Sequence, residues 1–161
     1  MKRFLAVLIF IAATNSAFAA DYVFGLGTSE FNRNGADSTG IFSAEIHGDP
    51  FFRKNRFSLS VFGVATVHSS GDLFVGAGLS GLFDFNNNWF IEGSIAPGFF
   101  HESRANNDLG SSFEIRSLLG AGYQLQSGDR ISLAITHKSN AGVSATNPGV
   151  NAVLLRYRHS F

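Results

Sequence analysis

The sequence reads SSFEIRSLLGAGYQL from Ser111 to Leu125, and apolar residues alternate with polar ones along much of it. A period of two residues is typical of a β-strand, whose successive side chains point to opposite faces. One face would carry Phe113, Ile115, Leu119, Tyr123 and Leu125, and the other Glu114, Arg116 and Gln124. The stretch therefore predicts a strand with one apolar face and one charged face.

The same alternation recurs along the chain and predicts an all-β protein. Eight strands are expected, over residues 21–31, 40–47, 56–67, 72–85, 89–101, 111–125, 130–139 and 150–161. The segments between them are rich in Asn, Asp, Gly and Ser, which favour turns through positive φ angles and local hydrogen bonds.

The N-terminal segment has the pattern of an export signal. Two positive charges in Met1–Arg3 precede an apolar run, Phe4–Ala13, and the small-residue pattern Ala17-Phe18-Ala19 follows. The run is shorter than the ~20 residues that a membrane-spanning helix needs, which argues against an uncleaved anchor. We predict a signal peptide over residues 1–19 and one domain over residues 20–161.

Composition excludes several classes of site. The chain has 161 residues, 12 Lys and Arg against 12 Asp and Glu, and no Cys. The absence of Cys excludes disulfides, thiolate zinc sites and a Cys nucleophile. Because the charge is balanced, there is no basic field for nucleic-acid binding. No metal or cofactor is expected.

Alternating strands suit either a soluble β-sandwich or a membrane barrel. Three features favour the barrel: the export signal, aromatic residues near strand ends, and a final Phe161 that resembles the assembly signal of bacterial outer-membrane proteins. A sheet in lipid must close, since its edge amides would otherwise be unpaired. We predict an eight-stranded antiparallel transmembrane β-barrel of the outer-membrane type. The aromatic residues are Tyr22, Trp89, Phe99 and Tyr157.

In such a barrel the charged face lines the lumen, where opposite charges can pair. The inward residues would be Glu45, Glu92, Glu114, Arg116, Arg156 and Arg158. An eight-stranded barrel is too narrow for a pore, so a channel is not expected. With both termini in the periplasm, residues 32–39, 102–110 and 140–149 form external loops. Residues 48–55 are long for a periplasmic turn, and nothing in the sequence accounts for them.

Two short motifs lack the context that their chemistry requires. Residues 76–81 read GAGLSG and match a dinucleotide fingerprint, but no helix pattern follows them. The pair His101-Glu102 has no second His at helical spacing. Small residues in a curved strand and a loop histidine explain these motifs better.

The informative segment lies at the end of the seventh predicted strand. His137 and Ser139 share a face with Ile135 and Leu133, which places them on the lipid-facing side. Asn151 begins the eighth strand with the same outward parity, so the three polar side chains can meet. A Ser hydroxyl becomes nucleophilic when an adjacent imidazole, oriented by a third group, takes its proton. Three ordinary interfacial polar residues are the alternative interpretation.

Here the sequence resembles the lipid A 3-O-deacylase family, the PagL-type outer-membrane enzymes. The residues that carry the resemblance are His137–Gly142, Asn147–Asn151, Leu109–Arg116 and Gly120–Tyr123. They cover roughly the last third of the chain, and the earlier strands match only in pattern. The resemblance implies a membrane-embedded barrel that removes the ester-linked acyl chain at position 3 of lipid A without a cofactor.

The resemblance also assigns roles. Ser139 would be the nucleophile, His137 the general base, and Asn140 with the amide of Gly142 the oxyanion donors. Asn151 stands where the family's third member is Glu. An amide oxygen can orient an imidazole, but it cannot stabilise the imidazolium by charge, so a lower or absent activity is expected.

Other hypotheses stay open at this point. A non-catalytic barrel with a structural or adhesive role is the second reading, and a soluble exported sandwich that binds a ligand is the third. Lipid A is the expected partner of an enzyme, and a homodimer is left open. Rim cations would meet its phosphates or remain solvated. They are Arg33, Arg104 and Lys138.

Overall fold

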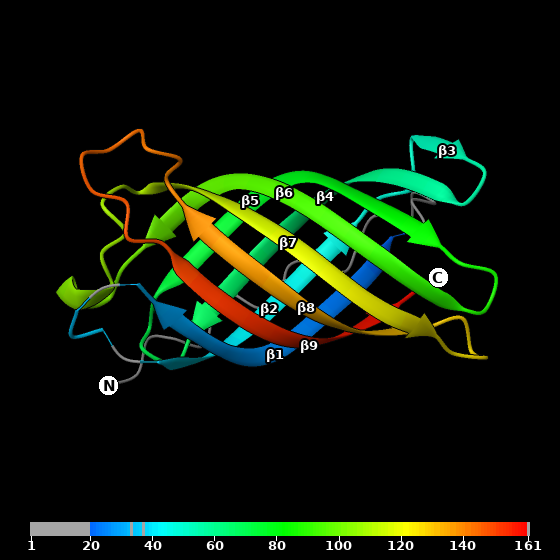
Figure 1. The fold of residues 1–161 in the computed structure, drawn as a ribbon, viewed down its shortest axis with the longest axis horizontal. Coiled ribbons are helices and arrows are strands. Elements are labelled where there is room, and N and C mark those ends of the chain that lie inside the picture. The colour runs from blue at the N-terminus through cyan, green and yellow to red at the C-terminus, as the bar shows by residue number, and fades with distance from the viewer. Residues whose placement is uncertain (1–19, 33, 37, 161) are drawn as a thin grey trace, which may run out of the picture.

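The chain folds into a closed antiparallel barrel (Figure 1). The computed structural model describes residues 20–32, 34–36 and 38–160. The predicted signal peptide, Arg33 and Phe161 lie outside the described residues. The strands of the barrel are β1 (Asp21–Phe31), β2 (Thr39–His47), β4 (Phe57–His68), β5 (Leu73–Asp84), β6 (Trp89–His101), β7 (Phe113–Gln124), β8 (Arg130–Ser139) and β9 (Val150–His159).

Pairing between β2 and β4 closes the sheet. Each other barrel strand pairs with its neighbour in the chain, and β1 also pairs with β9. The predicted fold class is confirmed, because all backbone ladders are antiparallel and eight strands complete the circle. Predicted strand bounds agree with the observed ones to within two residues, and β1, β6 and β8 agree fully.

A ninth strand, β3 (Phe52–Lys54), was not predicted. It pairs only with the first residues of β4 and lies at the end of the barrel away from the long loops (Figure 1). Asn55, at φ +55°, makes the tight turn between the two strands. This short hairpin accounts for the length of residues 48–55, whose turn character had concealed a strand.

The two faces of the sheet follow the alternation of the sequence. Apolar side chains point outward: Leu119, Leu133 and Leu155 are each at least 60% exposed. All six charged residues that were predicted to line the lumen are buried. Within the described residues, no helix is long and apolar enough to cross a membrane.

Charge pairs fill the middle of the lumen. Glu45 accepts hydrogen bonds from Arg116 and Arg156, each at 2.8 Å. Glu92 pairs with Arg156 and, at 3.3 Å, with Arg158. Buried charges are tolerated when they are paired in this way. The predicted interior pairing is confirmed for Glu45 and Glu92, whereas both carboxylate oxygens of the buried Glu114 lack a hydrogen-bond partner among the described residues.

An apolar cluster fills the lumen nearer to the end where the long loops gather, which we call the loop end. Phe74 and Phe100 belong to it, and the centres of their rings are 5.3 and 5.5 Å from Nζ of Lys138. Lys138 is 2% exposed, and its ammonium also lies 3.0 Å from Nε2 of His68. Lys138 is therefore an interior residue, and the expectation that it meets lipid phosphates at the rim is wrong. This packing holds the ends of β8 and β9 in place.

Asp72 links several segments at the loop end through hydrogen bonds to its side chain. Its carboxylate accepts hydrogen bonds from Ser70 Oγ at 2.6 Å, from the Ser103 amide at 2.7 Å and from Asn107 Nδ2 at 2.6 Å. Burial alone would raise the pKa of this carboxyl, but these hydrogen bonds outweigh burial and hold its pKa below the ordinary value. The turn after β4 is thereby joined to η1 (Ala105–Asn107).

Candidate active site

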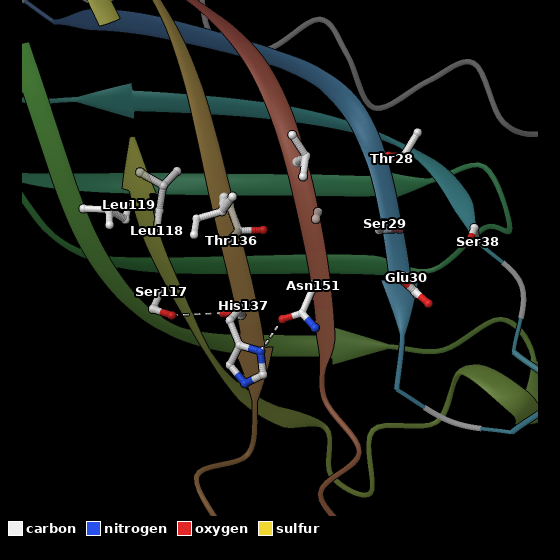
Figure 2. A pocket seen from close by; sticks show the side chains of 13 residues that line it. Thr28, Ser29, Glu30, Ser38, Ser117, Leu118, Leu119, Thr136, His137 and Asn151 are labelled. Carbon is white, nitrogen blue, oxygen red and sulfur yellow. Dashed lines mark hydrogen bonds between the residues drawn. The ribbon is translucent and has the colours of Figure 1, made fainter. Parts of the chain in front are cut away.

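His137 and Asn151 meet on the outer surface of the barrel near the loop end (Figure 2). They lie directly opposite each other in the register of β8 and β9, and both are exposed. Nδ1 of His137 and Oδ1 of Asn151 are 2.8 Å apart. The outward orientation and the contact agree with what strand parity predicts for these two residues.

This contact selects one tautomer of the imidazole. The amide oxygen of Asn151 can only accept a hydrogen bond, so Nδ1 of His137 must carry the proton. Nε2 then has a free lone pair and can take up a proton. The Asn151 amide is itself oriented, because its Nδ2 donates to Oδ1 of Asn32 over 3.5 Å. The backbone amide of Asn32 donates to the carbonyl of Gly149 at 3.1 Å, which joins β1 to the start of β9.

Ser139 lies two residues after His137 on the same face of β8. Residues at this spacing have Cα atoms about 6.6 Å apart. Ser139 is half-buried where β8 ends, opposite Ile115 of β7. Among the described residues, His137 and Ser139 share no hydrogen bond, so β8 places the two side chains on one face without joining them. Such bonds are often long before a substrate binds.

Asn140 organises the loop that follows. Its side chain is fully buried and donates to the carbonyls of Thr146 at 2.7 Å and Leu109 at 3.1 Å. Its Oδ1 accepts from the amide of Gly142 at 2.9 Å, and its own amide donates to Oδ1 of Asn147 at 3.0 Å. The donors predicted to hold an oxyanion thus already have acceptors, within the loop and at Leu109. Their role as oxyanion donors stays a prediction. It requires the Gly142 amide to give up its hydrogen bond to Oδ1 of Asn140 and to donate to the oxyanion instead.

Gly149 was missed by the sequence analysis, although it shapes the site. It has φ +71°, a conformation that favours glycine. A Cβ atom at this position would lie 2.9 Å from Cε1 of the His137 imidazole, which is closer than carbon atoms pack. The imidazole therefore occupies the space that the missing side chain leaves.

We expect Gly149→Ala to displace the imidazole, to break its contact with Asn151 and to cost about 1–2 kcal/mol of stability. Imidazole ¹⁵N NMR shifts in detergent micelles would report the loss of the fixed Nδ1–H tautomer. Gly128→Ala is the matched control, because Gly128 also has a positive φ, +94°, but open space around it. An unchanged tautomer in Gly149→Ala would contradict the expectation.

A shallow groove of about 470 Å³ runs beside His137 over β1, β7, β8 and β9 (Figure 2). Outward-facing Leu119, Ile135 and Val153 make it largely apolar. Ser117, also on its wall, donates to the carbonyl of His137 at 3.4 Å. The groove adjoins a basic imidazole nitrogen, so it can hold an apolar chain next to a proton acceptor.

Of the predicted rim cations, Arg104 is exposed beside η1, Arg33 lies outside the described residues, and Lys138 is interior. No group of three or more His, Asp and Glu side chains within the described residues is arranged to hold a metal ion. The site consists of an imidazole, an amide, a hydroxyl and an apolar groove.

Solved structures with the same fold include transmembrane β-barrels. The crystal structure of the outer membrane enzyme PagL superposes with a TM-score of 0.67 at 21% identity, covering 86% of this chain and 97% of that one. Neisserial surface protein A superposes with a TM-score of 0.56 at 11% identity, covering 91% and 98% of the two chains. At these identities the likeness is one of fold.

Two curated relatives match in sequence. The lipid A deacylase PagL of Bordetella bronchiseptica is 38% identical over 74 residues, which are 45% of this chain and 42% of the relative. The lipid A deacylase PagL of Pseudomonas aeruginosa is 33% identical over 70 residues, or 43% and 40% of the two chains. The aligned segments thus span about two fifths of each relative.

Fold and site together define an outer-membrane β-barrel with an imidazole–amide pair on its lipid-facing surface. The family model described as lipid A 3-O-deacylase (PagL) matches residues 38–160. The chain belongs to this family, and it is a protein of the bacterial outer membrane.

Proposed function

We propose that the protein is a lipid A deacylase that hydrolyses the ester-linked acyl chain at position 3. The observation that carries the proposal is the 2.8 Å contact between Nδ1 of His137 and Oδ1 of Asn151 on the lipid-facing surface. A polar pair in this position costs desolvation, and acid–base chemistry on a lipid gives a reason for it. The two curated relatives are named lipid A deacylases.

The reaction uses two acyl transfers. Nε2 of His137 takes the proton of the Ser139 hydroxyl as Oγ attacks the ester carbonyl, and a tetrahedral intermediate forms. Its collapse breaks the ester bond, and the imidazolium returns the proton to the departing sugar hydroxyl. Water then attacks the acyl-enzyme with His137 again as base, which releases the fatty acid and restores Ser139.

Placement on the outside of the barrel supports a membrane-bound substrate. The site lies at the loop end, which faces the exterior when both termini are periplasmic, and lipid A occupies the outer leaflet. A substrate would approach sideways through the bilayer, and its acyl chain would lie in the groove of Leu119, Ile135 and Val153. No passage through the charged lumen is needed.

Asn151 orients the imidazole, and its removal should lower the rate. We expect Asn151→Leu, which keeps the size but removes the acceptor, to reduce kcat about 10–100-fold because the Nδ1–H tautomer is no longer selected. Fatty acid release from lipid A in micelles would measure this change. Asn151→Asp keeps an acceptor and serves as the control. Equal rates for Asn151→Leu and the wild type would remove Asn151 from the mechanism.

Mass spectrometry of lipid A from cells that express the protein tests the function itself. Loss of one ester-linked acyl chain at position 3, compared with cells carrying an empty vector, is the expected result. An unchanged acylation pattern, with the protein folded as judged by heat-modifiable gel mobility, would favour the non-catalytic barrel. Purified protein with lipid A in detergent repeats the test without other cellular enzymes.

A further inference from the structure

Glu30 holds an unusual position on the barrel. It is exposed at the end of β1, where the outward-facing residues are Phe24, Leu26, Thr28 and Glu30. Every other Asp, Glu, Lys or Arg on the eight described barrel strands has inward parity. A carboxylate at a strand end, near the membrane interface, is tolerated at little cost. What sets Glu30 apart is that it is the one outward-facing charge on these described strands.

The register of the sheet places Glu30 in line with the site. Glu30 pairs with Asn151 across β1 and β9, and Asn151 pairs with His137 across β9 and β8. The three outward side chains therefore form one row across three neighbouring strands, and all three line the groove (Figure 2). Two strand spacings separate Glu30 from His137, which is about 9.6 Å.

We propose that Glu30 supplies the negative charge that Asn151 lacks, and that it stabilises the imidazolium of His137 during catalysis. The inference rests on the proposed deacylase function. Glu30 is a positioning residue in this scheme, because it acts on the substrate only through His137. It lies before residues 38–160, the segment that the family model matches, so its contribution is separate from the matched pattern.

Charge at this distance is effective because the row lies at a lipid surface. At an effective dielectric constant near 20, a unit charge still acts on an imidazole across two strands. The spacing of about 9.6 Å is that of the backbones, and the Glu30 side chain in Figure 2 extends away from His137. Water at the outermost edge would weaken the effect, whereas lipid packed over the groove would strengthen it.

The described residues around His137 offer no competing charge on the outward face. Ser117 faces it from β7 and Asn151 from β9, and neither titrates near neutral pH. Lys138, next to His137 on β8, and Arg116 on the adjacent strand β7 are buried in the lumen. The loop over residues 140–149 contains no charged side chain.

The test measures the NMR titration midpoint of the His137 imidazole and the rate of lipid A deacylation in the same micelles. In Glu30→Gln we expect the midpoint to fall and kcat/KM to fall a few-fold with it. The acidic limb of the pH–rate profile should move by the same amount. Glu30→Asp keeps the charge and should keep the midpoint, and Asp49→Asn, at the opposite end of the barrel, is the remote control.

Combining Glu30→Gln with a second substitution, Asn151→Glu, tests whether the effect is one of charge. When Asn151→Glu places a carboxylate directly on the imidazole, Glu30→Gln should no longer lower the rate, because the charge is already present. An unchanged midpoint in Glu30→Gln overturns the proposal, whether or not the rate falls. A wild-type protein that leaves lipid A intact, with a midpoint that still depends on Glu30, supports the electrostatic coupling and refutes the deacylase function.

Discussion

Replacing Ser139 by Ala is expected to reduce lipid A deacylation at least about a thousandfold. Without Oγ no acyl-enzyme can form, and only slow direct attack by water beside His137 remains. Release of fatty acid from lipid A in micelles, followed by mass spectrometry, measures the loss. Because Ser139 is half-buried and shares no hydrogen bond with His137 among the described residues, the substitution should leave the barrel intact.

Ser117→Ala is the matched control for this experiment. Ser117 is exposed, lines the same groove and donates a hydrogen bond to the backbone of His137. Unlike Ser139, it lies on β7 and does not share a strand with the imidazole. We expect less than about a threefold change for it, because only one weak hydrogen bond is lost. Full activity in Ser139→Ala would end its assignment as nucleophile, and an equal loss in both variants would point to the groove instead.

Replacing Glu45 by Ala is expected to destabilise the barrel by about 3–5 kcal/mol. Its carboxylate holds the guanidinium groups of Arg116 and Arg156, and the side chains of all three residues are at most 2% exposed. Removal leaves two buried positive charges with too few partners. Guanidinium-induced unfolding in micelles can be followed by the fluorescence of Trp89, the single tryptophan of the chain.

Asp84→Asn provides the comparison. Asp84 also pairs with an arginine, Arg130, at 2.6 Å, but its side chain is 41% exposed. Exposed pairs contribute about 0–1 kcal/mol, so the two variants should differ several-fold in their effect. Similar losses for Glu45→Ala and Asp84→Asn would mean that the lumen is wet enough to screen its charges.

Much of the barrel could be predicted from the sequence. Alternation along Phe113–Gln124 decides which side chains share a face, since the period of two is a property of the extended backbone itself. The same reasoning placed His137 and Asn151 outside and Glu45 inside, as observed. It failed for β3, because three residues are too few to show a period and Asn55 reads as a turn. It also gave Lys138 a rim role that its burial excludes.

The missed site residues share one cause. Glu30 and Asn32 lie more than a hundred residues from Asn151 in the chain, and only the pairing of β1 with β9 brings them next to it. Gly149 matters because of where the His137 ring comes to lie above it. Alternation along β1 could have placed Glu30 on the outer face. Its place beside the site depends on the register between β1 and β9, which pair only when the barrel closes.

The sequence by itself determined the strands, the two faces of the sheet and the outward direction of His137, Ser139 and Asn151. These are local properties, since each depends on the backbone geometry of a few consecutive residues. Tertiary structure decided the row from Glu30 through Asn151 to His137, the tautomer of the imidazole and the pairing of charges in the lumen. These depend on how distant strands align when the barrel closes, and alternation within one strand carries no information about that alignment.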